Sequence, residues 1–283
     1  MPFAAGLRPA TTSRVALPAA VSTLTAALLE AAPVPSTVLG VHAPALYLDV
    51  AGRVLPVLAS DAVPLATALR LAVPSGRVRW GVAAGDVVTV GAGRVVLPGW
   101  DVTAVRTWRP ARVRRITRSR TAGGGVPGDG DGGWFADGIR AVVLGLACAR
   151  GRQDDHPRTP GQGVDLLLGR GQGLTPSGDD ALAGILLVAH AVGEAAPLAA
   201  AVRSRLGATT AVSAALLDAA ADGYAAPDVV ALVDAALAGD DDTLARTLPA
   251  VLAMGHSSGR DLVAGIAGAV HHLTDTTTGR SAA

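Results

Sequence analysis

The chain has 283 residues, enough for one large domain or two ordinary ones with a sizeable core in either case. Half of the residues are hydrophobic but only 3% are aromatic, so the core is expected to consist of small aliphatic side chains. The net charge of +1 gives no overall field that would attract nucleic acid or an anionic membrane.

The first 32 residues are rich in alanine, but Arg8, Arg14, Pro18 and Glu30 interrupt them, so they do not have the pattern of a signal peptide. No run of the chain approaches the roughly 18 uninterrupted apolar residues that a transmembrane helix needs. The sequence therefore predicts a cytoplasmic protein with no membrane partner.

Two β-hairpins are predicted before residue 120. Residues 45–58 form two apolar runs around the short turn Ala51-Gly52-Arg53. Residues 86–97 form two more around Gly91-Ala92-Gly93. Helices are expected over residues 18–31 and 64–71. Residues 1–120 are thus predicted to be a mainly β region with a few helices.

The sequence changes character near residue 120. Residues 121–133 are dominated by glycine and are expected to be a flexible linker or loop. Just before them, seven arginines fall within residues 106–120, with Trp108 as the single interleaved aromatic residue. A nucleic-acid interface is one interpretation, but a solvated face or a surface between subunits is favoured because the rest of the chain is not basic. No nucleic-acid partner is expected.

Helical patterns fill residues 134–283, which are predicted to form a helical domain. The expected helices cover residues 134–150, 177–192, 210–222, 227–238, 241–253 and 258–273. The connections among the last four are short, as helix-packed domains require. The single cysteine, Cys148, excludes a disulfide within the chain and is expected to be a buried, inert thiol. The predicted fold class is α+β, with an N-terminal mainly β region and a C-terminal α-helical domain that carries two pseudo-repeated helix starts.

One nine-residue pattern occurs twice in this helical region. SGDDALAGI begins at Ser177 and SGRDLVAGI begins at Ser258, with six identical positions and an offset of 81. Asp180 and Asp261 each follow the serine by three residues, as in a capping box, so each pair is expected to cap and fix a helix start. A glycine about two turns further in allows close helix contact. We expect the two helices to pack together with pseudo-twofold symmetry.

The first helix start has features of an anion-binding loop. A helix N-terminus presents oriented N–H donors and a favourable dipole. Gly171 and Gly173 run into this start, and Gly178 leaves its backbone uncovered by a side chain. Like a phosphate loop, this loop is rich in glycine and leads into a helix N-terminus, but it is not a Walker A sequence. Arg170 can supply the positive charge.

Two further polar segments complete the candidate site. His256 and Ser257 precede the second helix start, and His256 is the one histidine beside the polar cluster, where it can serve as an acid or base. Thr209, Thr210 and Ser213 begin another helix, on which two hydroxyls one turn apart share a face.

The candidate residues fall into two sets. The predicted catalytic residues are His256, Ser257 and Ser258. The residues expected to bind substrate or anion are Arg170, Gly171, Gly173, Thr175, Ser177, Gly178, Asp179, Asp180, Thr209, Thr210, Ser213, Gly259 and Asp261. Simple helix capping would also explain the two serines. No metal ligand is assigned and no cofactor is certain, although Asp179 and Asp180 leave Mg²⁺ with phosphate open.

The run GQGLTPSGDD, from Gly171 to Asp180, resembles the hallmark of the family of AllH-type subunits of oxamate carbamoyltransferase. Thr209-Thr210 with Ser213 resembles the second block of that family. Residues 255–259 resemble its third block, together with Asp261. The resemblance covers roughly residues 135–270. Ala181 and Arg260 depart from the pattern, because the family often has an aromatic residue at each of these positions.

The resemblance implies a subunit of a complex that interconverts oxalurate plus phosphate with oxamate plus carbamoyl phosphate, in allantoin and purine nitrogen catabolism. It also implies partner subunits of the FdrA type. Phosphate, carbamoyl phosphate and oxamate are small anions, which helix N-termini and an arginine suit. In this hypothesis residues 171–178 hold the anion, Arg170 neutralises it, and His256 with the Ser257 and Ser258 hydroxyls polarises the carbamoyl group.

Two alternative functions use the same residues. One is a non-catalytic scaffold or sensor that binds small anions. The other is a metal-dependent hydrolase that uses Asp179, Asp180 and His256.

Overall fold

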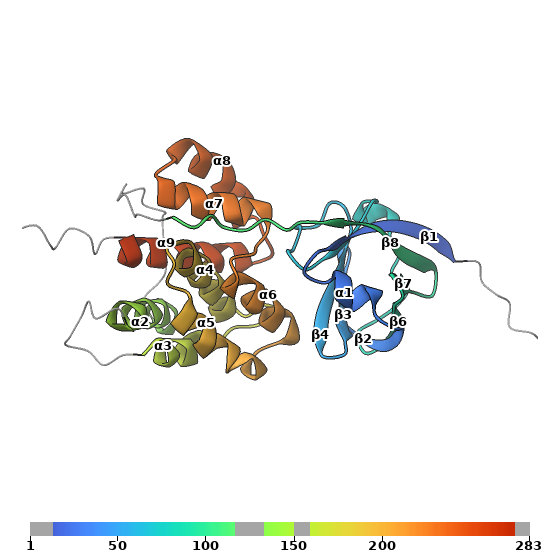
Figure 1. The fold of residues 1–283 in the computed structure, drawn as a ribbon, viewed down its shortest axis with the longest axis horizontal. Helices are drawn as coiled ribbons and strands as arrows, with labels where there is room; N and C mark the ends of the chain where they lie inside the picture. Colours follow the sequence, from blue (N-terminus) through green and yellow to red (C-terminus); the bar gives the residue numbers. More distant parts are fainter. Residues whose placement is uncertain (1–13, 117–132, 150–158, 275–283) are drawn as a thin grey trace, which may run out of the picture. The chain divides into compact units, whose positions relative to one another are not determined.

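The computed structural model describes residues 14–116, 133–149 and 159–274, which form two compact units (Figure 1). The first unit comprises Met1–Ala62 and Ala68–Trp108, and the second comprises Val63–Thr67 and Arg109–Ala283. Apart from Gly133, the predicted linker lies outside the described residues. The side chain of Cys148 lies outside them too.

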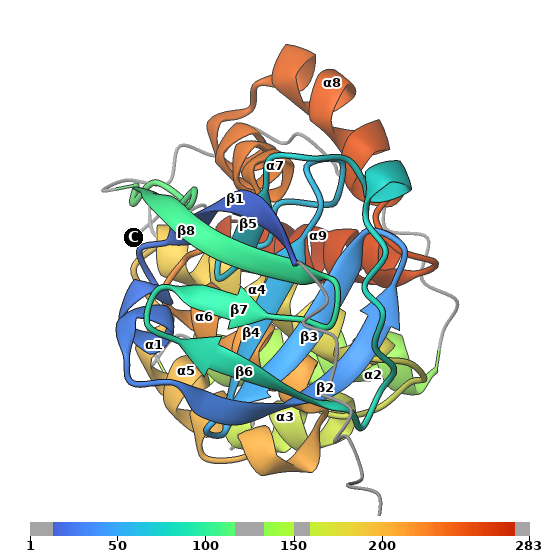
Figure 2. The same ribbon diagram turned by 90° about the vertical axis from the view of Figure 1, so that its right-hand side faces the viewer.

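The first unit is a closed barrel of eight strands in the order β1-β5-β4-β3-β2-β6-β7-β8. The strands are β1 (Val15–Ser22), β2 (Val34–His42), β3 (Ala45–Val50), β4 (Arg53–Leu58), β5 (Leu69–Leu71), β6 (Val87–Gly91), β7 (Arg94–Val96) and β8 (Trp100–Trp108). A short helix α1 (Ala26–Glu30) and a 3₁₀ turn η1 (Ser75–Arg77) accompany them. Figure 2 shows β6, β7 and β8 lying side by side.

Both predicted hairpins are confirmed. Strand β3 pairs with β4 and strand β6 with β7, each antiparallel. The turns between them place Ala51 and Ala92 at positive φ, each followed by a glycine at positive φ. Gly52 and Gly93 accept this backbone conformation without the steric penalty of a Cβ atom, which explains why glycine recurs at these turns.

The two helices predicted in this region are wrong over most of their length. Residues 18–22 belong to strand β1, and within the predicted helix 18–31 only Ala26–Glu30 is helical. Residues 64–71 contain no helix and end in strand β5. Alanine and leucine favour helices locally, but β1 pairs with β5 and β8 and buries alternate side chains in the barrel core, and this pairing prevails.

The second unit consists of helices. They are α2 (Trp134–Ala149), α3 (Pro160–Leu167), α4 (Ser177–Ala191), α5 (Ala196–Arg203), η2 (Leu206–Ala208), α6 (Ala211–Ala221), α7 (Pro227–Ala238), α8 (Asp241–Leu252) and α9 (Ser258–Thr274). The six predicted helices are confirmed to within two residues at each described end, and the α+β fold class is confirmed with them. Helices α3 and α5 were not predicted. No helix in the described part of the chain is long and apolar enough to cross a membrane.

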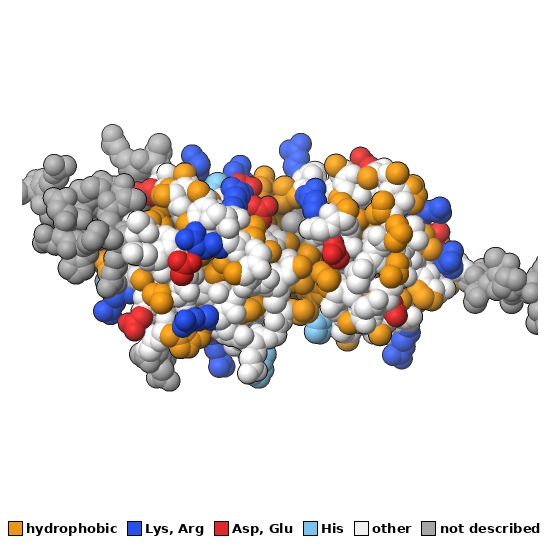
Figure 3. Space-filling model, turned by 90° about the horizontal axis from the view of Figure 1, so that it is seen from below, with side chains coloured by type: hydrophobic (Ala, Val, Ile, Leu, Met, Phe, Trp, Pro, Cys, Tyr) orange, Lys and Arg blue, Asp and Glu red, His pale blue; other side chains and the backbone are white. Residues whose placement is uncertain are grey.

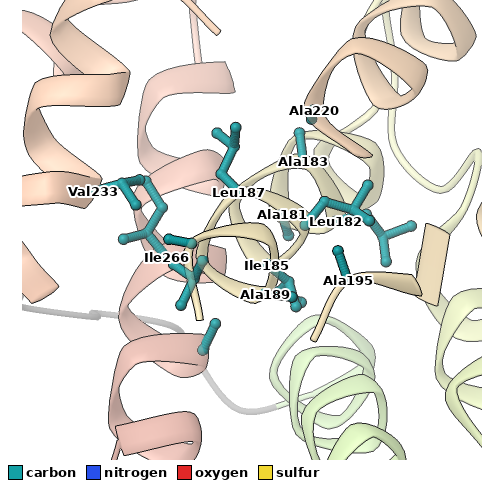
Figure 4. Packing of buried hydrophobic residues seen from close by; sticks show 14 of the residues in the cluster. Ala181, Leu182, Ala183, Ile185, Leu187, Ala189, Ala195, Ala220, Val233 and Ile266 are labelled. Atoms are coloured by element: carbon teal, nitrogen blue, oxygen red, sulfur yellow. The ribbon is translucent and has the colours of Figure 1, made fainter. Parts of the chain in front are cut away.

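Helix α4 is the centre of the helical unit. Every residue from 178 to 191 is buried, so the helix has no solvent face. Figure 4 shows the aliphatic side chains of α4, among them Leu182, Ile185 and Leu187, surrounded by neighbouring helices and close to Ile266 of α9 and Val233 of α7. A helix that is apolar on all sides must be enclosed by others. Polar residues at its first turn are therefore held in a rigid, buried frame.

Residues 112–114 of the arginine-rich segment pack on the helical unit, whereas residues 106–108 belong to strand β8 of the barrel. Val113 N–H donates to the Gly223 carbonyl at 2.9 Å. Arg114 pairs with Asp234, with Nε and Oδ2 2.9 Å apart, and the Arg112 guanidinium lies 5.0 Å from the centre of the Tyr224 ring. At least these two arginines thus contact their own chain. Figure 3 shows arginine and acidic side chains interspersed on the face that it draws, so this face carries no field of a single sign.

Candidate functional site

The loop between α3 and α4 brings three helix starts together. Residues 168–176 lead into α4, and hydrogen bonds from this loop or from the first turn of α4 reach the start of α6 and the start of α9. The three segments are separated by roughly 30 to 80 residues along the chain. The polar residues that the sequence singles out around Asp179, Thr210 and Ser258 therefore lie in one place.

Asp179 ties the loop to the segment before α6. Its Oδ1 accepts the Gly169 N–H at 2.7 Å, and its Oδ2 accepts the Thr209 hydroxyl. The side chain is 2% exposed. Because both carboxylate oxygens are engaged by the protein, Asp179 serves to hold the loop against the Thr209 segment.

Thr210 joins the loop to helix α6 in a second way. Its hydroxyl donates to the Leu174 carbonyl at 2.5 Å and also accepts the Ser213 N–H at 3.0 Å, which makes it the N-cap of α6. The Ser213 hydroxyl donates to the same Leu174 carbonyl at 3.5 Å. The predicted common face of Thr210 and Ser213 is confirmed, and both hydroxyls are used to fix the loop.

Asp180 is the buried acid of the site. Its side chain is 8% exposed and lies beside the Ser258 and Thr175 hydroxyls, which are 2.9 Å from each other. The pKa of Asp180 is raised to about 8, chiefly by burial. The negative charges of Asp261 and Asp179 also raise this pKa, whereas the hydrogen bond from Ser258 lowers it. The Asp180 carboxyl group is therefore mostly protonated at neutral pH.

Two carboxylate oxygens at this site are buried without a hydrogen-bond partner among the described residues. They are Oδ2 of Asp180 and Oδ2 of Asp261. Buried polar atoms are nearly always satisfied, so these two oxygens call for partners beyond the described residues: an acceptor for a protonated carboxyl, or a donor for an ionised one. A carbamoyl group, which has an acceptor oxygen and an NH₂ donor, would meet either need.

The predicted capping boxes are wrong in their details. The N-cap of α4 is Pro176, no side chain caps this helix, and Ser177 is its first residue. Helix α9 likewise begins at Ser258, whose hydroxyl bonds Thr175 across the helix pair. The Asp180 side chain is instead hydrogen-bonded to the hydroxyls of Ser258, at the start of α9, and of Thr175, in the loop before α4.

The glycines that follow the two serines are needed for packing. A Cβ atom on Gly178 would lie closer than 3.0 Å to the Leu167 carbonyl, and one on Gly259 would meet the Val251 carbonyl in the same way. Each is also buried, and the N–H groups of Gly178 and Gly259 donate to the Arg170 and Met254 carbonyls. The prediction that Gly178 leaves the helix start open to a ligand is therefore wrong, because the Leu167 carbonyl covers it. The equivalent fit of the two glycines against the end of a preceding helix supports the pseudo-repeat that the sequence predicts.

The other loop glycines permit a positive φ. Gly171 has φ +124° and Gly173 has φ +89°, and both are exposed. A Cβ on Gly171 would collide with the Ser177 backbone nitrogen, whereas nothing lies near the Cβ position of Gly173. The outer side of the loop at Gly173 is therefore open to a ligand.

Arg170 lies at the start of this loop and is exposed. Its guanidinium lies 5.8 Å from the centre of the Trp134 ring, a cation–π contact. No carboxylate in the described ranges forms an ion pair with it. Trp134 itself was not predicted as a site residue, and its exposure of 42% is the structural signal that identifies it.

His256 and Ser257 lie in the turn before α9. His256 is exposed and Ser257 is half-buried. They adjoin Ser258 in sequence, and so they flank the polar cluster at its solvent side. Within the described residues, no three His, Cys, Asp or Glu side chains are arranged to hold a metal ion. Of the two positions that depart from the family pattern, Arg260 is exposed and Ala181 is fully buried.

We expect Asp179→Ala to destabilise the helical unit by about 2–3 kcal/mol, because it leaves the Gly169 N–H and the Thr209 hydroxyl without their charged acceptor. Urea denaturation followed by circular dichroism measures the change. The exposed Asp228→Ala is the control, with an expected change below about 0.5 kcal/mol. An equal loss in the two variants would show that Asp179 does not hold the loop.

Comparison with known proteins bears on this site. Searches of curated proteins and of solved structures each returned no match. The matched range in the family comparison begins at Leu167, at the end of α3, and ends at Val270 in α9. It thus contains the loop and all three helix starts. Residues 167–270 match the family described as "Oxamate carbamoyltransferase subunit AllH", which confirms the resemblance predicted from the sequence.

Proposed function

We propose that this chain is a subunit of a carbamoyltransferase complex that interconverts oxalurate plus phosphate with oxamate plus carbamoyl phosphate. The observation that carries the proposal is that the loop and the three helix starts within the family match meet around two adjacent buried acids, Asp179 and Asp180. The allantoin and purine pathway, cytoplasmic location and FdrA-type partner subunits belong to the same proposal.

The reaction needs a site for an anion. A phosphate oxygen attacks the carbamoyl carbon of oxalurate, the bond from that carbon to the oxamyl nitrogen breaks, and the nitrogen takes up the proton that phosphate loses. In this proposal the exposed part of the loop around Gly173 receives the anion. The N–H groups of Gly178 and Asp179 already donate to the Arg170 and Pro176 carbonyls, so they hold the loop and do not bind the anion. Arg170, held over Trp134 and without an acidic partner among the described residues, neutralises the phosphate or the oxamate carboxylate.

The reaction also needs a polar environment for the carbamoyl group. The protonated carboxyl of Asp180 can donate a hydrogen bond to the carbamoyl oxygen, and its deprotonated form can accept from the NH₂ group. Ser258 and Thr175 lie within reach of the same carboxyl. His256 and Ser257, on the solvent side, are assigned to proton exchange with the leaving nitrogen. No covalent intermediate is required, because positioning and charge stabilisation suffice for transfer between bound anions.

The test is phosphorolysis of oxalurate by the complex reconstituted with its partner subunits, read as carbamoyl phosphate formed. We expect Ser258→Ala to lower kcat about 10- to 100-fold, since it removes a hydroxyl beside Asp180. Ser204→Ala is the matched control, because within the described residues the hydroxyl of this exposed serine bonds the Ala201 carbonyl and the Arg205 guanidinium, neither of which belongs to the site.

Three outcomes separate the alternatives. No carbamoyl phosphate from the wild-type complex would refute the proposed reaction. Full activity with both His256→Ala and Ser258→Ala would instead favour an anion-binding scaffold or sensor. Stoichiometric metal in the purified chain that is lost with Asp179→Asn would favour the metal-dependent hydrolase. If the activity of the complex depends on Mg²⁺, then Mg²⁺ is a cofactor of the proposed reaction.

A further inference from the structure

A second polar site lies on the outer surface of the barrel. Strand β1 pairs with β5 on one side and β8 on the other, and Ala20 is the register partner of both Arg70 and Arg106. Residues directly opposite one another on neighbouring strands point to the same face of a sheet. The two arginine side chains therefore flank a single methyl group, from strands that lie about 10 Å apart.

This face is the outside of the barrel. Leu17, Ala19 and Val21 of β1 belong to the barrel core, so Ala20, between them, points outward. A β-bulge follows on β8, where Val105 has no partner between the pairs Ala19–Ala104 and Ala20–Arg106. Bulges re-aim side chains and are frequent beside functional sites.

The Trp108 side chain orients one of the two arginines. Its indole Nε1 donates to the Ala68 carbonyl at 3.1 Å, which fixes the ring. The Arg70 guanidinium lies 5.5 Å from the centre of that ring. Neither Arg70 nor Arg106 forms an ion pair with any acidic side chain in the ranges that the structure describes. Two cations are thus held on one face without a counter-charge.

The arginines border a hollow of about 460 Å³. The other residues that line it are mainly apolar and include Pro18, Ala72 and Val105, with Ser60 among them as a polar residue. A hollow of this size suits a small molecule. The two guanidinium groups suit the oxygens of a phosphate or carboxylate, which they can bind in the bidentate manner. The apolar walls suit a flat or aliphatic body attached to that group.

We propose that this hollow binds a small organic anion in which a phosphate or carboxylate group is joined to an apolar body. The proposal goes beyond the proposed function, because every residue that carries it belongs to the barrel and none belongs to the helix starts. Arg70 and Arg106 bind the anionic group, and Trp108 holds Arg70 in position for it.

Isothermal titration calorimetry of the full chain with phenyl phosphate tests the proposal. We expect saturable binding that Arg70→Gln and Arg106→Gln each weaken at least tenfold. Arg53→Gln is the matched control, because Arg53 is exposed on the same barrel and lies outside the hollow, and it is expected to bind as the wild type does. Phenol and inorganic phosphate, each of which offers half of the probe, are expected to bind at least tenfold more weakly.

Each other result overturns the proposal. Absence of saturable binding shows that the hollow does not take this class of ligand. Binding that survives both Arg70→Gln and Arg106→Gln lies elsewhere on the chain. Equal weakening by Arg53→Gln indicates a general effect of charge, and equal binding of inorganic phosphate shows that the apolar walls contribute nothing.

Discussion

Asp180→Asn is expected to make the protein more stable than the wild type at pH 8, and this advantage should disappear toward pH 5. In the folded state the pKa of Asp180 is raised from its usual 3.8 to about 8, chiefly by burial. Between these two values the folded state binds more protons than the unfolded state, so the free energy of unfolding falls as the pH rises. The asparagine amide of the variant cannot ionise, so its free energy of unfolding does not fall with pH for this reason.

The magnitude follows from the same linkage. Each pH unit within the window costs on the order of 1 kcal/mol, so the difference between variant and wild type should grow by about 3 kcal/mol from pH 5 to pH 8. His190 acts in the opposite direction, because burial lowers its pKa and stability is lost as the pH falls. Taking the difference between the two proteins cancels this contribution.

The measurement is urea denaturation of both proteins at pH 5, 6, 7 and 8. Asp228→Asn, the same change at an exposed position, should show no difference in slope. If the free energies of unfolding of the wild type and of Asp180→Asn differ by the same amount at every pH in this range, Asp180 is ionised in the folded state. The acid role assigned to it in carbamoyl transfer would then fail, whereas the anion loop would be unaffected.

The helical unit was more predictable from the sequence than the barrel, for a physical reason. Each predicted helix has its own local signals, such as Pro227 in the first turn of α7 and Gly239 at its C-cap with φ +68°. The hairpins were also found because their turns are local. Strands β1 and β8, by contrast, pair in parallel across nearly 80 residues, and no local pattern reveals such a partner. The pairing of β1 was therefore not predicted, and residues 18–31 were expected to be helical.

The candidate site was likewise only partly predictable from the sequence. The sequence indicated which residues would gather, because one motif occurs twice and its glycines at positions 184 and 265 suggested close helices. It did not indicate how each side chain is used. Asp180 lies at a position suited to a cap, yet in the structure it contacts Ser258 of the other helix. Trp134 was missed because it is adjacent to Arg170 in space and 36 residues away in sequence.

Gly265→Ala is expected to destabilise the helical unit by about 2 kcal/mol, and Gly184→Ala by a similar amount. A Cβ atom on Gly184 would lie closer than 3.0 Å to the Leu262 carbonyl and the Ile266 nitrogen, and one on Gly265 would meet the Ala181 backbone likewise. These contacts are with backbone atoms, which cannot rotate away as a side chain can. Overpacking of this kind costs about 1–3 kcal/mol or more, against a gain of about 1 kcal/mol in helix propensity.

Gly207→Ala is the control, because nothing lies near its Cβ position, and it is expected to leave stability nearly unchanged. Thermal or urea denaturation measures all three variants. If either interface variant were more stable than the wild type, helix propensity would outweigh the clash, and α4 and α9 would not be in the tight contact that the structure shows.

The double variant Gly184→Ala/Gly265→Ala distinguishes close helix packing from two separate local clashes. Once one methyl group has pushed α4 and α9 apart, the second meets less resistance, so the combined loss should be smaller than the sum of the single losses. The same separation would draw Ser258 away from Thr175 and Asp180, whose contact depends on the helices being this close. In the reconstituted complex each single variant should therefore lose activity even where it remains folded, whereas additive losses with full activity would show that the helix spacing does not control the site.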